Sequence, residues 1–285
     1  MGAASPPRRG ALRRFLRNRL AVAGAAAVLL LALASAAGPL VWRTGYAQQF
    51  QDRERSAPSA AHPLGTDELG FDVLARVLYG GRASLLIALA ATAITVALAL
   101  AVGLAAGYAG GWVDASLMRL TDAVYAFPSI LLAMALVAVA DRPSLWLVFV
   151  ALGVTGWTGL ARLVRAQVLT VRGSDYVLAA KALGLPPLRI ALRHVLPNCL
   201  GPVVVSATLS LGGNILGEAG LSFLGLGVRE PYPSWGSMLG ASRDLFEACP
   251  WLMLFPGLAI SLAVLGFNLM GDGLRDALDP QAGRG

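Results

Sequence analysis

The sequence predicts an all-α, polytopic membrane protein with six transmembrane helices. The chain has 285 residues, of which 56% are hydrophobic and only 14% are charged, and this composition is unlike that of a soluble domain. Six windows contain no Asp, Glu, Lys or Arg, and each is long enough to cross a bilayer as a helix. These windows are 20–41, 84–106, 124–140, 144–160, 199–217 and 251–271.

The distribution of basic residues predicts the orientation of these spans. If the N-terminus is cytoplasmic, the internal segments are 1–19, 107–123, 161–198 and 272–285, and they hold 15 of the 23 Lys and Arg residues. The external segments 42–83, 141–143 and 218–250 hold the other 8. Because basic residues are enriched on the cytoplasmic side, we expect a multi-pass protein of the cell membrane with both termini inside. The net charge of +7 is then a topology signal, and no nucleic-acid surface is expected.

The N-terminal region has a second interpretation. An Arg-rich start, an apolar stretch and the sequence Ala34-Ser35-Ala36 imitate a cleavable signal peptide. The apolar run continues to Trp42, which is long for a signal core, so we favour a retained first helix. We therefore divide the chain into 1–83, with the tail, first helix and external loop, and 84–285, a five-helix core.

The residues needed for chemistry are sparse. Lys181 is the only lysine and follows Ala180, so the chain has no Gly-Lys pair for a phosphate-binding loop. His62 and His194 fall on opposite sides of the membrane in this topology, which argues against a shared metal site. Glu218 lies at the outer end of the fifth span, and it is either a functional intramembrane carboxylate or a hydrated or paired interfacial residue.

The sequence of the internal loop 161–198 predicts one short helix, with a residue suited to start it and another suited to end it. Ser174 is a suitable cap for a helix from Asp175 to Leu183, and Gly184 suits the left-handed position that follows a helix. Two apolar stripes at helical spacing predict a surface that rests on lipid or docks on a partner protein, and small residues favour docking. The stripes are Tyr176, Ala179, Ala180 and Leu183, then Leu188, Ala191, Leu192 and Val195, with Arg189 and Arg193 on the other side.

This loop resembles the EAA loop of binding-protein-dependent ABC importer permeases. The similarity lies in Asp175–Gly184 and in Arg193–Asn198, with the Ala-Ala, Gly and Leu-Pro positions at matching spacing. In that family the loop is a coupling helix that inserts into a cleft of an ATP-binding subunit. Leu178 stands at the family's acidic first position, so that charge contact is not carried over. The resemblance implies coupling roles for Asp175, Tyr176, Ala179, Ala180, Lys181, Gly184, Arg193, His194 and Pro197.

Further segments resemble the second, C-type permease subunit of the dipeptide, oligopeptide and nickel subfamily. They are His62–Asp72, Glu218–Gly227, Pro233–Gly236, Pro250-Trp251 and Asn268–Pro280. Phe71 replaces an arginine that is usual in the family. The external-loop residues implied are Gly65, Thr66, Asp67 and Asp72, and those for translocation or gating are Glu218, Gly220, Ser222, Phe223, Gly225 and Trp235. Residues 219–228 form either a re-entrant plug or a turn.

The resemblance implies a type I ABC importer permease with no enzymatic activity of its own. Its expected partners are a second permease subunit, two ATP-binding subunits that carry ATP and Mg²⁺, an external solute-binding protein and membrane lipid. Two alternatives from other classes are a membrane enzyme that acts on lipid and an ion-coupled carrier. The spans carry no charge pattern that separates dipeptide from oligopeptide, nickel chelate or glutathione as the solute.

Overall fold

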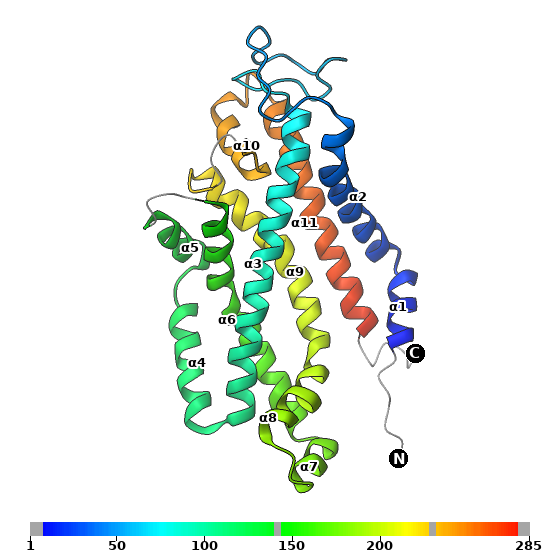
Figure 1. Cartoon of the computed structure of the whole chain (residues 1–285), viewed down its shortest axis with the longest axis vertical. Coiled ribbons are helices and arrows are strands. Elements are labelled where there is room, and N and C mark those ends of the chain that lie inside the picture. Colours follow the sequence, from blue (N-terminus) through cyan, green and yellow to red (C-terminus); the bar gives the residue numbers. More distant parts are fainter. Residues whose placement is uncertain (1–7, 140–143, 228–231, 279–285) are drawn as a thin grey trace.

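The computed structural model describes residues 8–139, 144–227 and 232–278, and these form an elongated bundle of helices (Figure 1). The only β-type pairings in this part of the chain are two isolated bridges, Gln49 with Phe71 and Thr66 with Asp72. The helices are α1 Arg8–Arg17, α2 Arg19–Val41, α3 Val73–Ala109, α4 Gly111–Tyr125, α5 Ser129–Ala138, α6 Leu145–Arg172, α7 Asp175–Ala182, α8 Pro187–Ile190, the π-helix η1 Ala191–Val195, α9 Leu196–Phe223, α10 Trp235–Ser242, the 3₁₀-helix η2 Arg243–Leu245 and α11 Trp251–Leu278.

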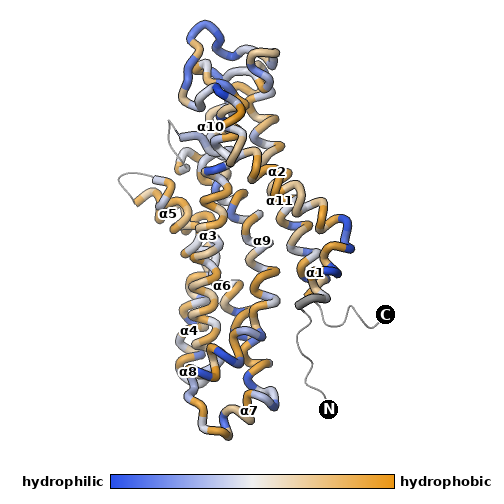
Figure 2. Tube along the Cα trace, turned by 45° about the vertical axis from the view of Figure 1, so that its right-hand side comes forward, coloured by the Kyte–Doolittle hydropathy of each residue, from blue (hydrophilic) through white to orange (hydrophobic). Residues whose placement is uncertain are grey.

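Five helical stretches are long and apolar enough to span a membrane, which confirms five of the predicted windows. They are α2, α3, α6, the continuous stretch Pro187–Phe223 and α11, and the tube in Figure 2 is largely hydrophobic along them. The sixth predicted window, 124–140, is not one continuous helix. Helices α4 and α5 meet there at an angle of 80°, because Pro128 has no N–H to donate and disfavours a helical Phe127. If α4 and α5 together cross the membrane, they form a sixth span that is broken in the middle.

The helices also extend beyond the charge-free windows. Helix α3 begins at Val73 and therefore includes Arg76 and Arg82, and α6 continues to Arg172. Charged side chains at the ends of membrane helices reach water or protein partners, so a search for charge-free windows stops too early. The division at 83/84 falls inside α3. The external connection 141–143 and the motif end at 279–280 lie outside the described residues.

The two ends of the bundle differ. The segment 42–72 and α10 lie at one end, while α7, α1 and the C-terminal end of α11 lie toward the other (Figure 1). This arrangement agrees with an even number of crossings. That the α7 end faces the cytoplasm stays a prediction from the basic residues.

An arginine of α3 compensates for a missing backbone hydrogen bond in α2. Pro39 lies inside this helix and lacks the N–H that would pair with the carbonyl of Ser35, four residues earlier. Arg82 of α3 donates from Nε to that carbonyl at 2.7 Å and from Nη2 to the carbonyl of Ala36 at 2.7 Å. The first span is therefore joined to the core by a contact that its own proline makes necessary.

Helices α3 and α6 form the most extensive helix pair, and glycines let their backbones approach. A Cβ at Gly103 of α3 would lie 2.6 Å from the carbonyl oxygen of Ala161 and 2.6 Å from Cβ of Val164. A Cβ at Gly153 of α6 would lie 2.7 Å from Cβ of Ile94. Small residues at such contacts allow the dispersion and Cα–H contacts that hold membrane helices together.

We expect Gly103→Val to lower the free energy of unfolding by about 1–3 kcal/mol, because the new side chain overlaps α6. Gly159→Val is the matched control, since a Cβ at Gly159 meets no atom of the described chain within 4 Å. Thermal unfolding of the purified chain in detergent measures both variants. Equal losses for the two variants would contradict the packing argument.

Candidate functional site

Helix α7 has the short, sharply ended form that the sequence predicts. Gly184 follows it with φ +74°, its N–H bonds to the carbonyl of Lys181 at 2.9 Å, and the N–H of Leu185 bonds to that of Ala180 at 3.3 Å. This pair of bonds is a Schellman motif. Ser174 precedes the helix as predicted, but its hydroxyl donates backward to the carbonyl of Val171 at 2.6 Å rather than capping α7.

The predicted stripe on α7 needs a correction. Ala180 does not share an exposed face with Tyr176, Ala179 and Leu183: it is only 4% exposed, and Val177, which the prediction omitted, is 0% exposed. Both belong to a buried cluster with residues of α3, α6, α8, η1 and α9 that includes Ala99, Val164, Val168, Ile190, Val195 and Val203. A helix of two turns has room for one face against the bundle, and Val177 and Ala180 form it. Asp175, Tyr176, Ala179, Lys181 and Gly184 remain exposed.

The second predicted stripe is also divided between inside and outside. Ala191 and Val195 are buried, whereas Leu188 and Leu192 are exposed. The stripe does not lie on one regular α-helix, because the π-helix η1 at Ala191–Val195 interrupts it. Arg193 and Pro197 are exposed and His194 is half-buried, with no partner for its buried Nδ1 in the described part of the chain.

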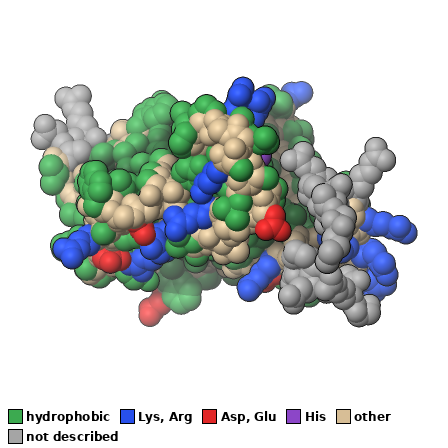
Figure 3. Space-filling view, turned by 90° about the horizontal axis from the view of Figure 1, so that it is seen from below, with side chains coloured by type: hydrophobic (Ala, Val, Ile, Leu, Met, Phe, Trp, Pro, Cys, Tyr) green, Lys and Arg blue, Asp and Glu red, His purple; other side chains and the backbone are tan. Residues whose placement is uncertain are grey.

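Arginine contacts join the helices at the α7 end into one unit. Arg165 of α6 makes a two-point ion pair with Asp114 of α4, at 2.5 and 2.6 Å. Arg172 of α6 donates at 2.8 Å to the carbonyl of Gly107, near the C-terminus of α3, where the helix dipole favours positive charge. Lys and Arg side chains are spread over this end of the molecule (Figure 3). These contacts tie α3, α4 and α6 together near α7.

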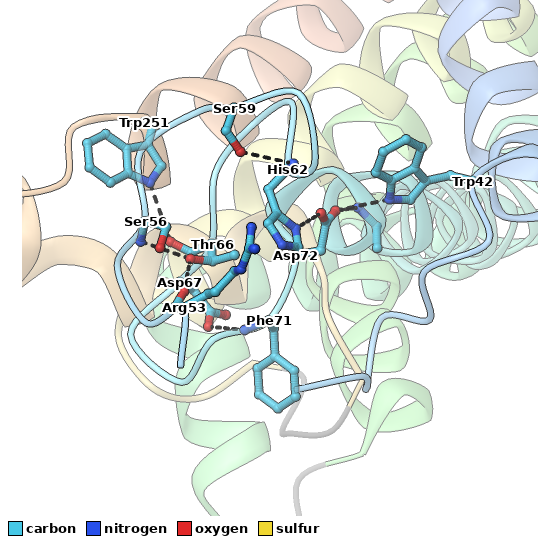
Figure 4. A network of polar contacts seen from close by, with 11 residues as sticks. Trp42, Arg53, Ser56, Ser59, His62, Thr66, Asp67, Phe71, Asp72 and Trp251 are labelled. Carbon is cyan, nitrogen blue, oxygen red and sulfur yellow. Dashed lines mark hydrogen bonds and ion pairs between the residues drawn. The ribbon is translucent and has the colours of Figure 1, made fainter. Parts of the chain in front are cut away.

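At the opposite end, Asp72 is the centre of a polar network (Figure 4). It is 0% exposed and accepts from Ala75 N at 2.8 Å as the N-cap of α3, and from Trp42 Nε1 at 3.2 Å. Its other oxygen lies 2.7 Å from Nδ1 of His62. One carboxylate therefore fixes the end of the first span, the external segment and the start of α3.

The remaining external residues shape the loop that leads to Asp72. Gly65 has φ +80° and lies so close to Trp251 that a Cβ would be 2.8 Å from the indole Nε1. Thr66 accepts from Ser56 N and donates to the carbonyl of Arg53, and Asp67 accepts from Arg76 Nη1 at 3.1 Å. Phe71, which replaces the family's arginine, lies under the Arg76 guanidinium at 4.9 Å. The structure thus brings Gly65, Thr66, Asp67 and Asp72 together as one folded loop.

Glu218 is buried and hydrogen-bonded rather than hydrated. It is 0% exposed, and three serine hydroxyls donate to its carboxylate: Ser84 at 3.1 Å, Ser222 at 2.7 Å and Ser234 at 2.7 Å. These serines come from α3, from α9 itself and from the N-cap of α10. Trp235 is also buried there, and its main-chain N–H donates to Ser84 Oγ at 3.1 Å. This Glu218 cluster fastens the external helix α10 onto two spans.

The other predicted gating residues lie in the last turn of α9 and just after it. Gly220, Ser222 and Phe223 are helical, and Gly225 ends the helix with φ +80°, where the N–H of Leu226 bonds to the carbonyl of Leu221 at 2.8 Å. The segment 219–227 is therefore the end of a span and its turn, not a separate re-entrant element. Position 228 lies outside the described residues, and the gating role stays a prediction.

We expect Glu218→Leu to lower the free energy of unfolding by at least about 2 kcal/mol, because three buried hydroxyls lose their acceptor. Glu218→Gln keeps one acceptor oxygen and should cost less. Glu247→Leu removes an exposed acid from the same external region and is the control. Thermal unfolding and the rate of proteolysis around α10 are the measurements. If Glu218→Leu behaves like the control, the cluster does not hold α10.

Comparisons with known proteins match nearly the whole chain. Residues 99–284 match the family model for the binding-protein-dependent transport system inner membrane component, and residues 6–58 match the N-terminal TM domain of oligopeptide transport permease C. The chain is 42% identical over 275 residues to the dipeptide transport system permease protein DppC of Alkalihalophilus pseudofirmus, which covers 96% of this chain and 90% of that protein. It is 43% identical over 273 residues to the oligopeptide transport system permease protein OppC of Escherichia coli, which covers 95% and 90%.

Proposed function

Because the chain belongs to the family of binding-protein-dependent transport system inner membrane components, we propose that it is one of two permease subunits of an ATP-driven importer of di- or oligopeptides. The relatives' names support a peptide cargo. In this proposal an external solute-binding protein delivers the peptide, and a second, homologous permease completes the passage. Two ATP-binding subunits hold ATP and Mg²⁺ and hydrolyse the nucleotide. The chain lies in the inner or plasma membrane with both termini in the cytoplasm.

The observation that carries this proposal is that α7 has one buried side and one exposed side. The buried side joins, through Val177 and Ala180, a close-packed cluster that also contains residues of α3, α6, α8, η1 and α9, so a movement of the helix disturbs the packing of that cluster. The other side exposes Tyr176, Ala179 and Leu183, the last at 82%. A short helix with an exposed, mainly apolar face fits a cleft on a partner protein. ATP then shifts the permease between states only if the partner's contacts with α7 differ between them.

We expect Leu183→Asp to reduce ATP-dependent uptake and copurification of the ATP-binding subunits at least tenfold, a loss of about 1.4 kcal/mol in their interaction. The residue is exposed just after α7, so the change should not disturb packing. Leu16→Asp is the control, since Leu16 is 61% exposed and its helix α1 lies toward the same end of the bundle as α7 (Figure 1). The second permease should copurify normally with both variants.

Normal uptake and normal copurification of Leu183→Asp would overturn the coupling role. Ala180→Asp is a poorer test, because it places a charge inside the buried cluster and disturbs packing as well as docking. The two alternative functions predict different results: a lipid-modifying enzyme acts as an isolated chain, and an ion-coupled carrier moves solute along an ion gradient without ATP or partners.

A further inference from the structure

A polar groove of about 290 Å³ lies between α3, α5, α6 and α9, and its lining ends at Gly217, next to Glu218. Most of its lining positions carry hydroxyl, amide or glycine residues, although the four helices are mainly apolar. No acid, lysine, arginine or histidine is among the described residues that line it. The lining consists of Thr95, Ser129, Ile130, Leu152, Thr155, Gly156, Ser210, Gly213, Asn214 and Gly217.

The polar groups of the groove are left mainly as hydrogen-bond acceptors. The hydroxyl of Thr155 donates to the carbonyl of Ala151 at 2.9 Å, and that of Ser210 donates to the carbonyl of Ser206 at 2.9 Å. Thr95 similarly donates to the carbonyl of Gly153 at 3.1 Å. Because a hydroxyl has one proton and two lone pairs, each of these oxygens can still accept but has no proton to offer.

Asn214 adds a further acceptor and keeps one N–H of its amide. Its Nδ2 donates to Thr92 Oγ1 at 2.9 Å, which orients the amide and leaves the carbonyl oxygen Oδ1 as an additional acceptor. An uncharged wall of acceptors attracts N–H groups and does not select for the charge of a side chain. Main-chain amides and the amino terminus of a peptide are donors of this kind.

One glycine of the groove has no packing role within the chain. A Cβ at Gly217 would lie 2.9 Å from Leu152, so contact between α6 and α9 explains that glycine. A Cβ at Gly213 would meet no atom of the described residues within 4 Å, although glycine costs a helix about 1 kcal/mol relative to alanine. The missing side chain keeps the groove open to something from outside the chain.

We propose that this groove is the part of the passage where N–H groups of the translocated peptide bind to the uncharged oxygens of Thr95, Thr155, Ser210 and Asn214. The inference rests on the proposed function and adds the chemistry by which the cargo is held. Its volume is near the lower end for ligand sites, which suits a wall that holds a short segment of an extended peptide. Gly213 supplies the clearance, and neutral acceptors make the hold independent of the cargo's side-chain charge.

The location is tested with a cysteine in the reconstituted importer, with its binding protein and ATP-binding subunits. Cys199 and Cys249 are both buried, so a water-soluble thiol reagent should react mainly with an introduced Gly213→Cys. We expect labelling that slows at least threefold when a transported tripeptide and ATP are present. Gly201→Cys, in the same helix but outside the groove, also has open space around its Cβ and should be insensitive to peptide.

Two results of this experiment would overturn the proposal. If Gly213→Cys is not labelled in the assembly with or without peptide, the second permease fills the groove. If it is labelled at the same rate with and without peptide, the cargo does not pass there. A wild-type assembly that takes up no peptide at all would instead contradict the proposed function, so the two failures are distinguishable.

The chemistry is tested with Thr155→Val and the matched control Thr208→Val. Both threonines are buried and donate at 2.9 Å to the carbonyl four residues earlier, but only Thr155 lines the groove. The measurement is the ratio between the uptake of a tripeptide and the uptake of its backbone N-methylated analogue. The same binding protein is used for every variant, so that its own preference between the two peptides cancels when the variants are compared. Thr155→Val should lower this ratio at least threefold, and Thr155→Ser and Thr208→Val should leave it unchanged. An unchanged ratio in Thr155→Val would show that the groove does not bind N–H groups.

Discussion

The hydrocarbon of the membrane offers no partner for a free N–H or carbonyl group, and the rest of this structure depends on that constraint. It forces the chain into helices, and each interruption then needs a partner from another helix. The proline in α2 is the clearest case, because Arg82 of α3 supplies the donors that Pro39 cannot. The hydroxyls of α6 and α9 obey the same constraint by bonding to their own backbone.

Different interactions hold the two ends of the molecule together, and at each end they come from a few buried side chains. At the end that carries segment 42–72 and α10, the carboxylates of Asp72 and Glu218 are enclosed by donors and fix a loop and a short helix onto the spans. At the other end, apolar contacts of Val177 and Ala180 fix α7. The carboxylates hold one defined geometry through directed hydrogen bonds, whereas Val177 and Ala180 hold α7 through close packing.

Between these ends, the bundle combines rigid and open regions. Glycines of α3 and α6 bring these helices into direct backbone contact, and the ion pair of Arg165 with Asp114 adds α4 to the unit. The groove beside α9 instead leaves space next to Gly213. Glycine therefore has two opposite effects in this bundle. Where another helix lies against it, it allows close contact between the two helices, and where no atom lies near it, it leaves open space.

The sequence alone determined the class of fold, five of the spans and the end of α7 at Gly184, because hydropathy and backbone preference act over short stretches of chain. It also located the residues that resemble a permease. Only the tertiary structure decided that 124–140 is broken, that Ala180 faces inward while Leu183 faces outward, and that Glu218 collects serines from three helices. Those outcomes depend on which helices are neighbours, and a uniformly apolar helix carries little information about which of its faces will meet protein.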